Sequence, residues 1–402
     1  MAVQLLSNVR ALVGNRVMDA ATVAVEDGRI VGVEENRSYA GARDGRGAFC
    51  LPGLVDCHCD ALEREVSPRP TVTFDPEFAL RSLEARFLGA GITTACHGVA
   101  FASEWDHVRN PAMAAALVDV IAARRAAGAR IDHRVLFRPP ARSAGSVDRV
   151  IECLPGGQPA GDVPLVSFED HTPGQGQYRD VEMYKAAISA DRRASIPDLD
   201  AEIARRMAEA EALLPIREAN LALVRDMAAA GSARVLAHDC VDPEEVAWAR
   251  GWGAAVAEFP VTVAAARAAR DQQMPVVLGA PNVLLGGSHS GNASAEELIA
   301  LGYCTALASD YAPSTLLAAA FDLASRKVVE FPAALGLITS GPAEAVGLRD
   351  HGRLDPGCVA DLVLVEQDGR WPRVVAVFAS PCGATGPTPR ADVPWQLETF
   401  PV

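Results

Sequence analysis

The sequence predicts an α/β protein: a (β/α)8 barrel of the TIM type, with a small β-sandwich domain formed by both chain ends. Two observations predict this class. In the middle of the chain, eight strand-like runs alternate with alanine-rich helical segments, the pattern of a parallel sheet with crossover helices. Both chain ends read instead as short strands joined by turns. We therefore predict a small β domain from residues 1–50 and 346–402, and a barrel from residues 51–345.

Eight strand-like runs define the predicted barrel, and a TIM barrel requires eight strands. They are 53–60, 93–99, 133–137, 163–170, 234–238, 254–259, 275–279 and 305–309. After the fourth run, residues 198–230 are rich in Ala, Glu, Arg and Leu and stop at Gly231, as a helix with a glycine beyond its C-terminus does. We interpret this segment as an enlarged helical connection rather than a separate domain.

The chain ends carry the turn signals of a small β domain. Near the N-terminus, turns are predicted at 13–15 and 26–29 between short alternating strands. Near the C-terminus, 361–366 and 374–378 read as strands separated by the turn signal Asp368-Gly369. Neither end has the period of a helix.

Composition predicts a soluble, cytoplasmic protein. The formal net charge is −14, which argues against binding nucleic acid, because that binding depends on a basic surface. No window approaches the roughly 20 apolar residues of a membrane span, and the first residues do not read as a signal peptide. Nine scattered cysteines suggest reduced thiols in the cytosol. The expected partner is a small molecule, with a homo-oligomer left open.

Five of the eight runs end in residue types that bind metals. In a TIM barrel the catalytic residues lie at the C-terminal ends of the strands. Imidazoles and carboxylates from separate strands suit zinc, manganese or iron, and Asp310 is placed to orient or deprotonate a water. The sixth run carries Glu258. The metal ligands that we predict are His58, Asp60, Glu169, His171, His238 and Asp310.

Cys57 and Cys59 offer a competing interpretation of the first run as a structural zinc site. Successive side chains of a strand point to opposite faces, so the two thiols should face away from His58 and toward the helix layer. We therefore favour His58 and Asp60 as the ligands from this strand.

A glycine- and serine-rich loop and several cations are candidates for substrate binding. Residues 286–292 follow the seventh run, where TIM barrels often bind phosphate, and could present N–H and O–H donors to an anion. Arg69 lies between two prolines, and His133 and Arg134 follow in the third run, with Arg138 nearby. The alternatives are a flexible turn and ordinary salt bridges. The predicted contacts are Arg69, His133, Arg134, Gly287, Ser288, His289, Ser290 and Asn292.

Two signatures carry a resemblance to a known family. Leu-Pro-Gly-Leu-Val-Asp-Cys-His at 51–58 and Gly-Arg-Leu-Asp-Pro-Gly-Cys-Val-Ala-Asp-Leu-Val at 352–363 resemble the opening and closing signatures of the amidohydrolase superfamily. That pair accounts for a β domain made from both ends. Further motifs look like those of the diphosphohydrolase family in the carbon-phosphorus lyase pathway of phosphonate metabolism. They lie at 58–60, 67–70, 91–94, 170–175, 257–262, 279–282, 286–292 and 309–311.

The resemblance runs from about residue 3 to 378, and it implies a reaction. That family hydrolyses α-D-ribose 1-methylphosphonate 5-triphosphate to the 5-phosphate and pyrophosphate, so we expect a phosphorylated sugar as substrate and one or two divalent ions, zinc before manganese or iron. The chain has Asp60 where the superfamily usually has a second histidine, and it lacks the usual carbamylated-lysine context at the fourth strand. Glu169 and Asp170 are therefore both candidates for the carboxylate that bridges the metal ions. Asp170 matches the family motif, and with Asp310 it is our predicted catalytic residue.

Two other functions remain alternatives. The same barrel and metals would serve an amide hydrolase or a deaminase acting on a C–N bond, because a fold does not fix a function. The second alternative is a non-enzymatic function, in which the barrel binds no metal and serves as a structural subunit. It would have lost its ligands, whereas His58, His238 and Asp310 are present.

Overall fold

The computed structural model describes residues 3–69, 71–102, 109–190, 198–288, 291–379 and 396–399. The chain divides into two compact units: Met1–His97 with Asp119–Arg134 and Thr305–Val402, and Gly98–Val118 with Val135–Cys304. Two eight-stranded sheets account for all the strands described. The domain boundaries predicted at residues 50 and 346 stay a prediction. The order of the strands shows which sheet each strand belongs to, but it does not show where one domain ends and the next begins.

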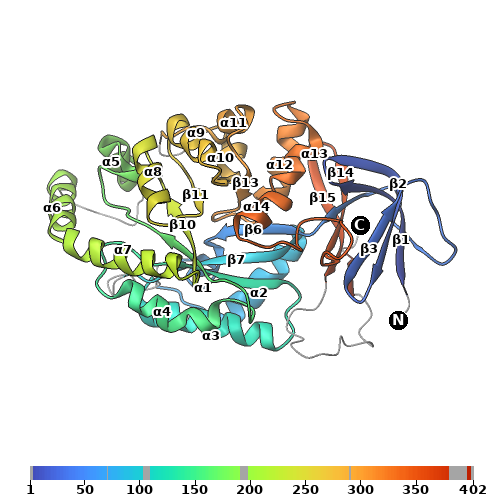
Figure 1. Ribbon diagram of the computed structural model, residues 1–402, viewed down its shortest axis with the longest axis horizontal. Helices are drawn as coiled ribbons and strands as arrows, with labels where there is room; N and C mark the ends of the chain where they lie inside the picture. The colour runs from blue at the N-terminus through green and yellow to red at the C-terminus, as the bar shows by residue number, and fades with distance from the viewer. Residues whose placement is uncertain are drawn as a thin grey trace. The chain divides into compact units, whose positions relative to one another are not determined.

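One sheet is the barrel, whose parallel strands follow one another in chain order (Figure 1). Its strands are β6 (Leu54–Cys59), β7 (Ile92–Ala100), β8 (Asp132–Arg138), β9 (Leu165–Phe168), β10 (Arg234–His238), β11 (Val256–Glu258), β12 (Val276–Gly279) and β13 (Ala306–Ala308). Each lies within two residues of its predicted run. The first and last strands meet where the Asp310 amide donates to the His58 carbonyl at 3.0 Å. The predicted barrel is confirmed.

A helix follows every barrel strand. In chain order they are α1 (Ala61–Val66), α2 (Pro76–Gly89), α3 (Pro111–Ala126), α4 (Ser146–Gly157), α5 (Val181–Ala190), α6 (Leu199–Ala212), α7 (Leu214–Ala229), α8 (Pro243–Gly251), α9 (Val263–Asp271), α10 (Ala280–Leu285), α11 (Ala295–Ala300), α12 (Thr315–Ser325), α13 (Phe331–Gly336) and α14 (Ser340–Ala345). A short 3-10 helix, η1 (Gly176–Tyr178), precedes α5. Helices α6 and α7 confirm the enlarged helical connection.

Local chemistry explains where these elements begin and why the strands are apolar. Asp75 caps α2 by accepting hydrogen bonds from the amides of Glu77 and Phe78, and Pro76 fits the first helical position. Every residue of β7 and β8 is buried. Parallel strands covered on both faces read as such continuous buried runs.

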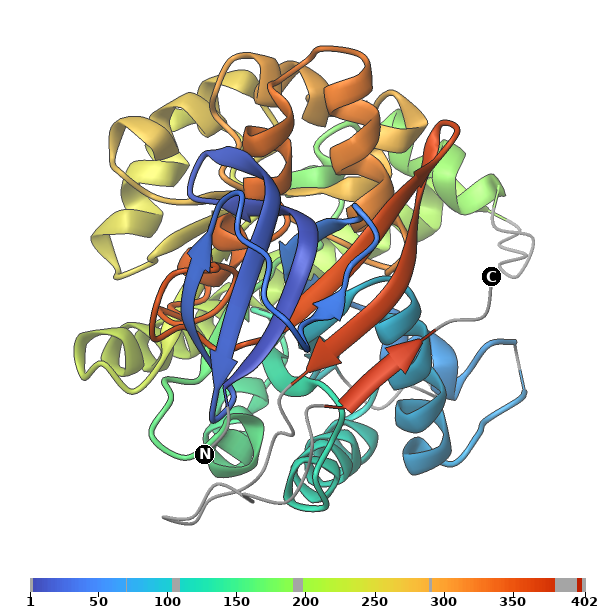
Figure 2. The ribbon, with the colours of Figure 1, turned by 90° about the vertical axis from the view of Figure 1, so that its right-hand side faces the viewer.

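The second sheet joins the two ends of the chain, as predicted, and Figure 2 shows the N-terminal and C-terminal strands lying in it together. Its strands are β1 (Gln4–Val13), β2 (Arg16–Glu26), β3 (Arg29–Glu34), β4 (Arg43–Asp44), β5 (Phe49–Pro52), β14 (Leu362–Asp368), β15 (Trp371–Ala379) and β16 (Gln396–Thr399). Antiparallel pairing of β5 with β14 sets Leu51 opposite Val363. Leu6, Val23, Leu362 and Phe378 share one buried core.

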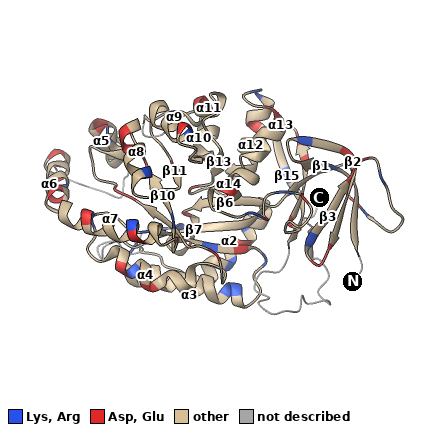
Figure 3. Ribbon diagram, viewed as in Figure 1, with Lys and Arg blue, Asp and Glu red and all other residues tan. Residues whose placement is uncertain are grey.

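The described surface carries both signs of charge. In the coloured ribbon of Figure 3, acidic and basic residues are interspersed along α2, α4 and α7. Among the described residues, every cysteine is a free thiol. No helix in the part of the chain that the structure describes combines the length and the apolar composition that crossing a membrane requires.

Candidate metal centre

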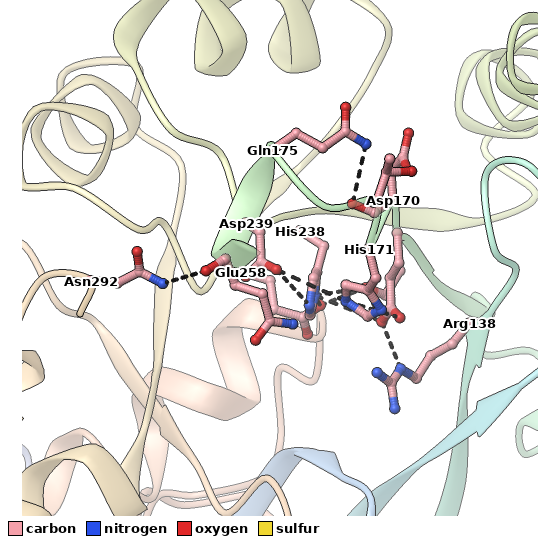
Figure 4. A network of polar contacts seen from close by, with 12 residues as sticks. Arg138, Asp170, His171, Gln175, His238, Asp239, Glu258 and Asn292 are labelled. Carbon is pink, nitrogen blue, oxygen red and sulfur yellow. Dashed lines mark hydrogen bonds and ion pairs between the residues drawn. The ribbon is translucent and has the colours of Figure 1, made fainter. Parts of the chain in front are cut away.

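Glu169, His171 and His238 form a cluster that could hold a metal ion. One ligand atom from each lies within 4.8 Å of the others. Glu169 and His171 follow β9, and His238 is the last residue of β10, so two neighbouring strands supply all three side chains. Figure 4 shows His171 and His238 beside each other. His171 Nε2 lies 3.9 Å from a carboxylate oxygen of Glu169. This cluster brings together three of the six predicted ligands.

Glu258 fixes the orientation of His238. The Glu258 carboxylate is fully buried and lies 2.8 Å from Nδ1 of His238. The Ser167 hydroxyl donates to the same carboxylate oxygen at 2.5 Å. A carboxylate at one imidazole nitrogen sets the tautomer and directs the other nitrogen toward a metal. Nε2 of His238 is therefore the nitrogen available as a ligand.

The protonation states of Glu169 and His171 suit metal binding. Burial alone would raise the pKa of Glu169, but Arg138, His238 and His171 outweigh it and lower the pKa to about 2. Arg138 Nε donates to the Glu169 carboxylate at 2.6 Å. Burial lowers the pKa of His171 to about 4, although the negative charge of Glu169 opposes this shift. At neutral pH the carboxylate is thus ionised and the imidazole neutral, which are the forms that bind metals.

The surroundings of His238 favour a positive charge. Burial would lower the pKa of His238, but the carboxylates of Asp239, Glu169 and Glu258 outweigh it and raise the pKa to about 9. Burial raises the pKa of Asp239 to about 6, against the opposing effect of His238. Three buried carboxylates around one imidazole are stabilised by a positive charge at this point, because buried negative charges are costly without one. The donor set of imidazoles and carboxylates therefore fits a divalent metal such as zinc, manganese or iron.

Strained backbone marks the ends of three barrel strands. Asp239 follows β10 with a φ of 58°, Phe259 follows β11 with a φ of 51°, and Asp310 lies two residues beyond β13 with a φ of 55°. Residues other than glycine adopt positive φ uncommonly, and such residues occur in turns as well as at functional sites. The three values mark the points where the chain turns away from the barrel strands.

His58, Asp60 and Asp310 form a second group, in the other unit of the chain. Nε2 of His58 lies 3.3 Å from a carboxylate oxygen of Asp60, and both side chains are buried. The amide of Asp60 donates to the Asp310 carbonyl at 2.5 Å. Buried Asp56 anchors this region by accepting from the amide and hydroxyl of Ser309, at 3.0 and 2.5 Å. The remaining three predicted ligands thus lie together.

The two carboxylates left open by the sequence have different surroundings. Glu169 lies beside the histidines, whereas Asp170 accepts from Arg142 Nε at 2.8 Å and lies 3.4 Å from Arg217 Nε. Thr172 donates to Asp170 as well, at 2.6 Å. The geometry favours Glu169 as the ligand and pairs Asp170 with cations.

The predicted substrate contacts are spread over different environments. Arg69 is exposed, and Gly287 and Ser288 are half-buried. Asn292 donates from Nδ2 to the Gln177 carbonyl at 3.2 Å, which ties the 286–292 loop to the loop after β9. His289 and Ser290, like Pro70, lie outside the described residues.

His133 and Arg134 are engaged inside the protein. The His133 ring is fully buried, with Nε2 2.9 Å from the Glu84 carboxylate and Nδ1 2.9 Å from His97. Arg134 donates to Asp132 at 2.6 Å. Both nitrogens of the His133 ring therefore have protein partners. A contact from His133 to substrate stays a prediction.

This buried histidine pair predicts acid lability. Burial lowers the pKa of both His97 and His133 below the ordinary value of 6.5. The unfolded chain therefore binds more protons, so the stability they confer is full above about pH 6.5 and falls below it by about 1.4 kcal/mol per pH unit per histidine. We expect the melting temperature to fall between pH 7.5 and pH 5.5, and to fall less in His97→Asn. Equal falls in both proteins would refute this role.

Asp239 and Glu258 contribute to the cluster but are not among the predicted ligands. Alternation along a strand places Asp239 on the face opposite His238. The positive φ of Asp239 breaks that alternation and turns the carboxylate back toward the histidines, with Oδ2 3.5 Å from His238 Nε2. The position of Glu258 at the end of the sixth run was the available signal, and its contact with His238 depends on the neighbouring strand.

A parallel barrel with imidazoles and carboxylates at its strand ends is the architecture of a metal-dependent hydrolase. The model of the amidohydrolase family matches residues 75–370, and the chain belongs to that family. Enzymes of this family generally use divalent metals, and the chain is a hydrolase.

One relative with a known name resembles the chain over nearly its whole length. The chain is 34% identical over 375 residues to the α-D-ribose 1-methylphosphonate 5-triphosphate diphosphatase of Escherichia coli (strain K12), covering 90% of this chain and 95% of that protein. Solved structures that resemble it include a triazine hydrolase variant (TM-score 0.62, 94% of each chain covered). Another is the 5-methylcytosine deaminase of Klebsiella pneumoniae (TM-score 0.61, 94% and 96% covered). Both are 16% identical and establish the fold alone.

Proposed function

We propose that this hydrolase cleaves α-D-ribose 1-methylphosphonate 5-triphosphate to the 5-phosphate and pyrophosphate, in the cytoplasm, as a step of phosphonate degradation. The observation that carries the proposal is the 34% identity to a diphosphatase of that name across nearly the full length of both chains. The sequence motifs at 58–60, 170–175 and 286–292 support it.

Residues at the strand ends would hold the metal. Glu169, His171 and His238 have the geometry for it, and Glu169 and His171 are also in the protonation states that bind metals. His58, Asp60 and Asp310 keep their place among the proposed ligands from the sequence, because they follow the first and last strands of the barrel sheet. A divalent metal, zinc before manganese or iron, supplies Lewis acidity toward a phosphoryl oxygen and lowers the pKa of water.

Two aspartates have proposed roles in the reaction. Asp310 accepts the proton of the attacking water as general base. Asp170 acts through the arginines that it pairs with: its carboxylate holds Arg142 at 2.8 Å and Arg217 at 3.4 Å, and guanidinium groups suit a phosphate leaving group. Asp170 is thus proposed as a positioning residue for two cations.

Fixed donors must neutralise the substrate. A chain of net charge −14 can bind a triphosphate only where metals and local cations override the overall field. Arg69 and the 286–292 loop, with Gly287, Ser288 and Asn292 among its described residues, are the proposed contacts. His289 and Ser290 keep their place in the proposal from the sequence.

Hydrolysis of a C–N bond is the alternative function. The fold shared with a triazine hydrolase variant and a deaminase supports this alternative at the level of architecture. Exposed Arg69 and the glycine- and serine-rich sequence of the 286–292 loop favour an anionic substrate instead.

Phosphorus NMR of the products tests the proposal. We expect pyrophosphate from ribose 5-triphosphates that carry a 1-phosphonate. Arg69→Ala should lower kcat/KM for the triphosphate by about 10- to 100-fold, the size of a lost hydrogen bond to a charged group. Arg37→Ala is the matched control, because it removes another exposed arginine, from the loop between β3 and β4. Orthophosphate alone, or turnover of cyclic amides with intact triphosphates, would replace this proposal by the amide hydrolase.

A further inference from the structure

We propose that Asp239 supplies a further metal-ligating oxygen beside Glu169, His171 and His238. No role was assigned to Asp239 by the sequence motifs or by the comparisons. The inference rests on the proposed metal dependence, but it concerns metal binding alone and not the identity of the substrate.

The first observation is a buried oxygen without a hydrogen bond. Asp239 is 6% exposed, and within the described residues its Oδ2 has no hydrogen-bond partner. Leaving a carboxylate oxygen buried in this way costs folding free energy unless a positive group offsets it. The nearest described ion-pair partners are Nε2 of His238 at 3.5 Å and Nε2 of His171 at 3.9 Å. Both nitrogens belong to proposed ligands.

The second observation is the spacing of these atoms. Tetrahedral ligands at about 2.1 Å from a zinc ion lie about 3.4 Å from one another. The carboxylate oxygen of Asp239 and the two imidazole nitrogens approach that spacing. Because Glu258 lies at Nδ1 of His238, the Nε2 lone pair of His238 is directed to the side on which Asp239 lies. A single cation could contact all three atoms.

The chain holds this carboxylate in place by its backbone. The φ of 58° at Asp239 turns the side chain out of the strand alternation, and the Gln177 amide donates to the Asp239 carboxylate. Gly176 passes so close that a Cβ there would lie 3.3 Å from the Asp239 Cβ. Asn292 in turn binds the Gln177 carbonyl, as Figure 4 shows. One main-chain donor orients the carboxylate and leaves Oδ2 toward the histidines.

A path for the ion is also present. A cavity of about 540 Å³ is lined by His238 and Asp239 together with the two tryptophans of the α8 region, Trp248 and Trp252. Glu244 lies on its exposed rim at the start of α8. A metal site needs such an entry path in addition to ligands and geometry.

Metal affinity of an isosteric variant tests the inference. Metal-free protein is reloaded with zinc or manganese alone, in competition with a chromogenic chelator. We expect Asp239→Asn to weaken binding by about 10- to 100-fold. Glu244→Gln, the matched control that removes one negative charge from the same cavity, should change affinity less than about two-fold. Wild-type affinity in Asp239→Asn, or equal weakening in both variants, would overturn the assignment.

A ligand swap gives an independent readout. Thiolates bind Co²⁺ with a charge-transfer absorption in the near ultraviolet, because sulfur is a soft and polarisable ligand. Cobalt-loaded Asp239→Cys should acquire that band relative to wild type, whereas Glu244→Cys should not. A cobalt-loaded Asp239→Cys without the band would show that residue 239 does not touch the metal. Neither measurement uses a substrate. If the protein does not hydrolyse the triphosphate, these two measurements still show whether Asp239 binds the metal.

Discussion

Removal of bound metal is expected to lower turnover on the order of a thousand-fold, because the lost transition-state stabilisation amounts to several kcal/mol. Protein made in metal-replete medium should contain zinc, manganese or iron by elemental analysis, and a chelator should remove metal and activity together. Activity should be lost with the metal because the side chains described at this site offer no substitute for it. At neutral pH Glu169 is ionised and His171 is neutral, so both side chains donate electron pairs and neither can act as a Lewis acid in place of the ion.

The control for chelation is restoration. Adding back one of the three metals should recover turnover, and His58→Ala should lower metal content together with activity. Undiminished turnover in metal-free protein, with indifference to added metal, would remove the basis of the hydrolase mechanism.

Asp310→Asn is expected to lower kcat by about 10²- to 10⁴-fold while leaving the fold intact, because the amide cannot accept a proton from water. The substitution isolates chemistry from structure. Asparagine tolerates the φ of 55° at this position better than most residues do. The two hydrogen bonds that Asp310 makes to His58 and Asp60 in this strand pair are made by its backbone, which the substitution retains.

Two measurements decide the outcome for Asp310→Asn. The melting temperature should stay close to wild type, and Asp355→Asn, an exposed aspartate in a turn, should keep normal turnover. Near-normal kcat with unchanged stability would show that another group is the base.

The architecture was predictable because its signals are local. The strand β10 has the limits read from the sequence at 234–238, and the turn signals at both ends predicted the hairpins of the terminal sheet. Residues two apart on a strand share a face, which agrees with the closeness of the ligand atoms of Glu169 and His171.

The rest depended on contacts that no local pattern contains. His133 looked like a substrate cation, yet its partner Glu84 lies on a helix 49 positions earlier in the chain. Asp239 is not among the predicted ligands, because strand alternation does not account for its place beside the histidines, where its backbone has a positive φ of 58°. Asp170 matches a family motif, and only the structure pairs it with Arg142 and Arg217.

The terminal sheet has a consequence for synthesis of the protein. Strand β5 pairs with β14, and about 310 residues separate Leu51 from its partner Val363, so at roughly 5–20 residues per second the ribosome delivers the partner about 15–60 s later. Throughout that interval β1 can cover one edge of β5, but the edge that pairs with β14 has no strand beside it, and open edges pair readily with other chains. Nascent or stalled chains that end before residue 361 are therefore the forms of this protein most exposed to aggregation, and chaperone demand should peak just before translation ends.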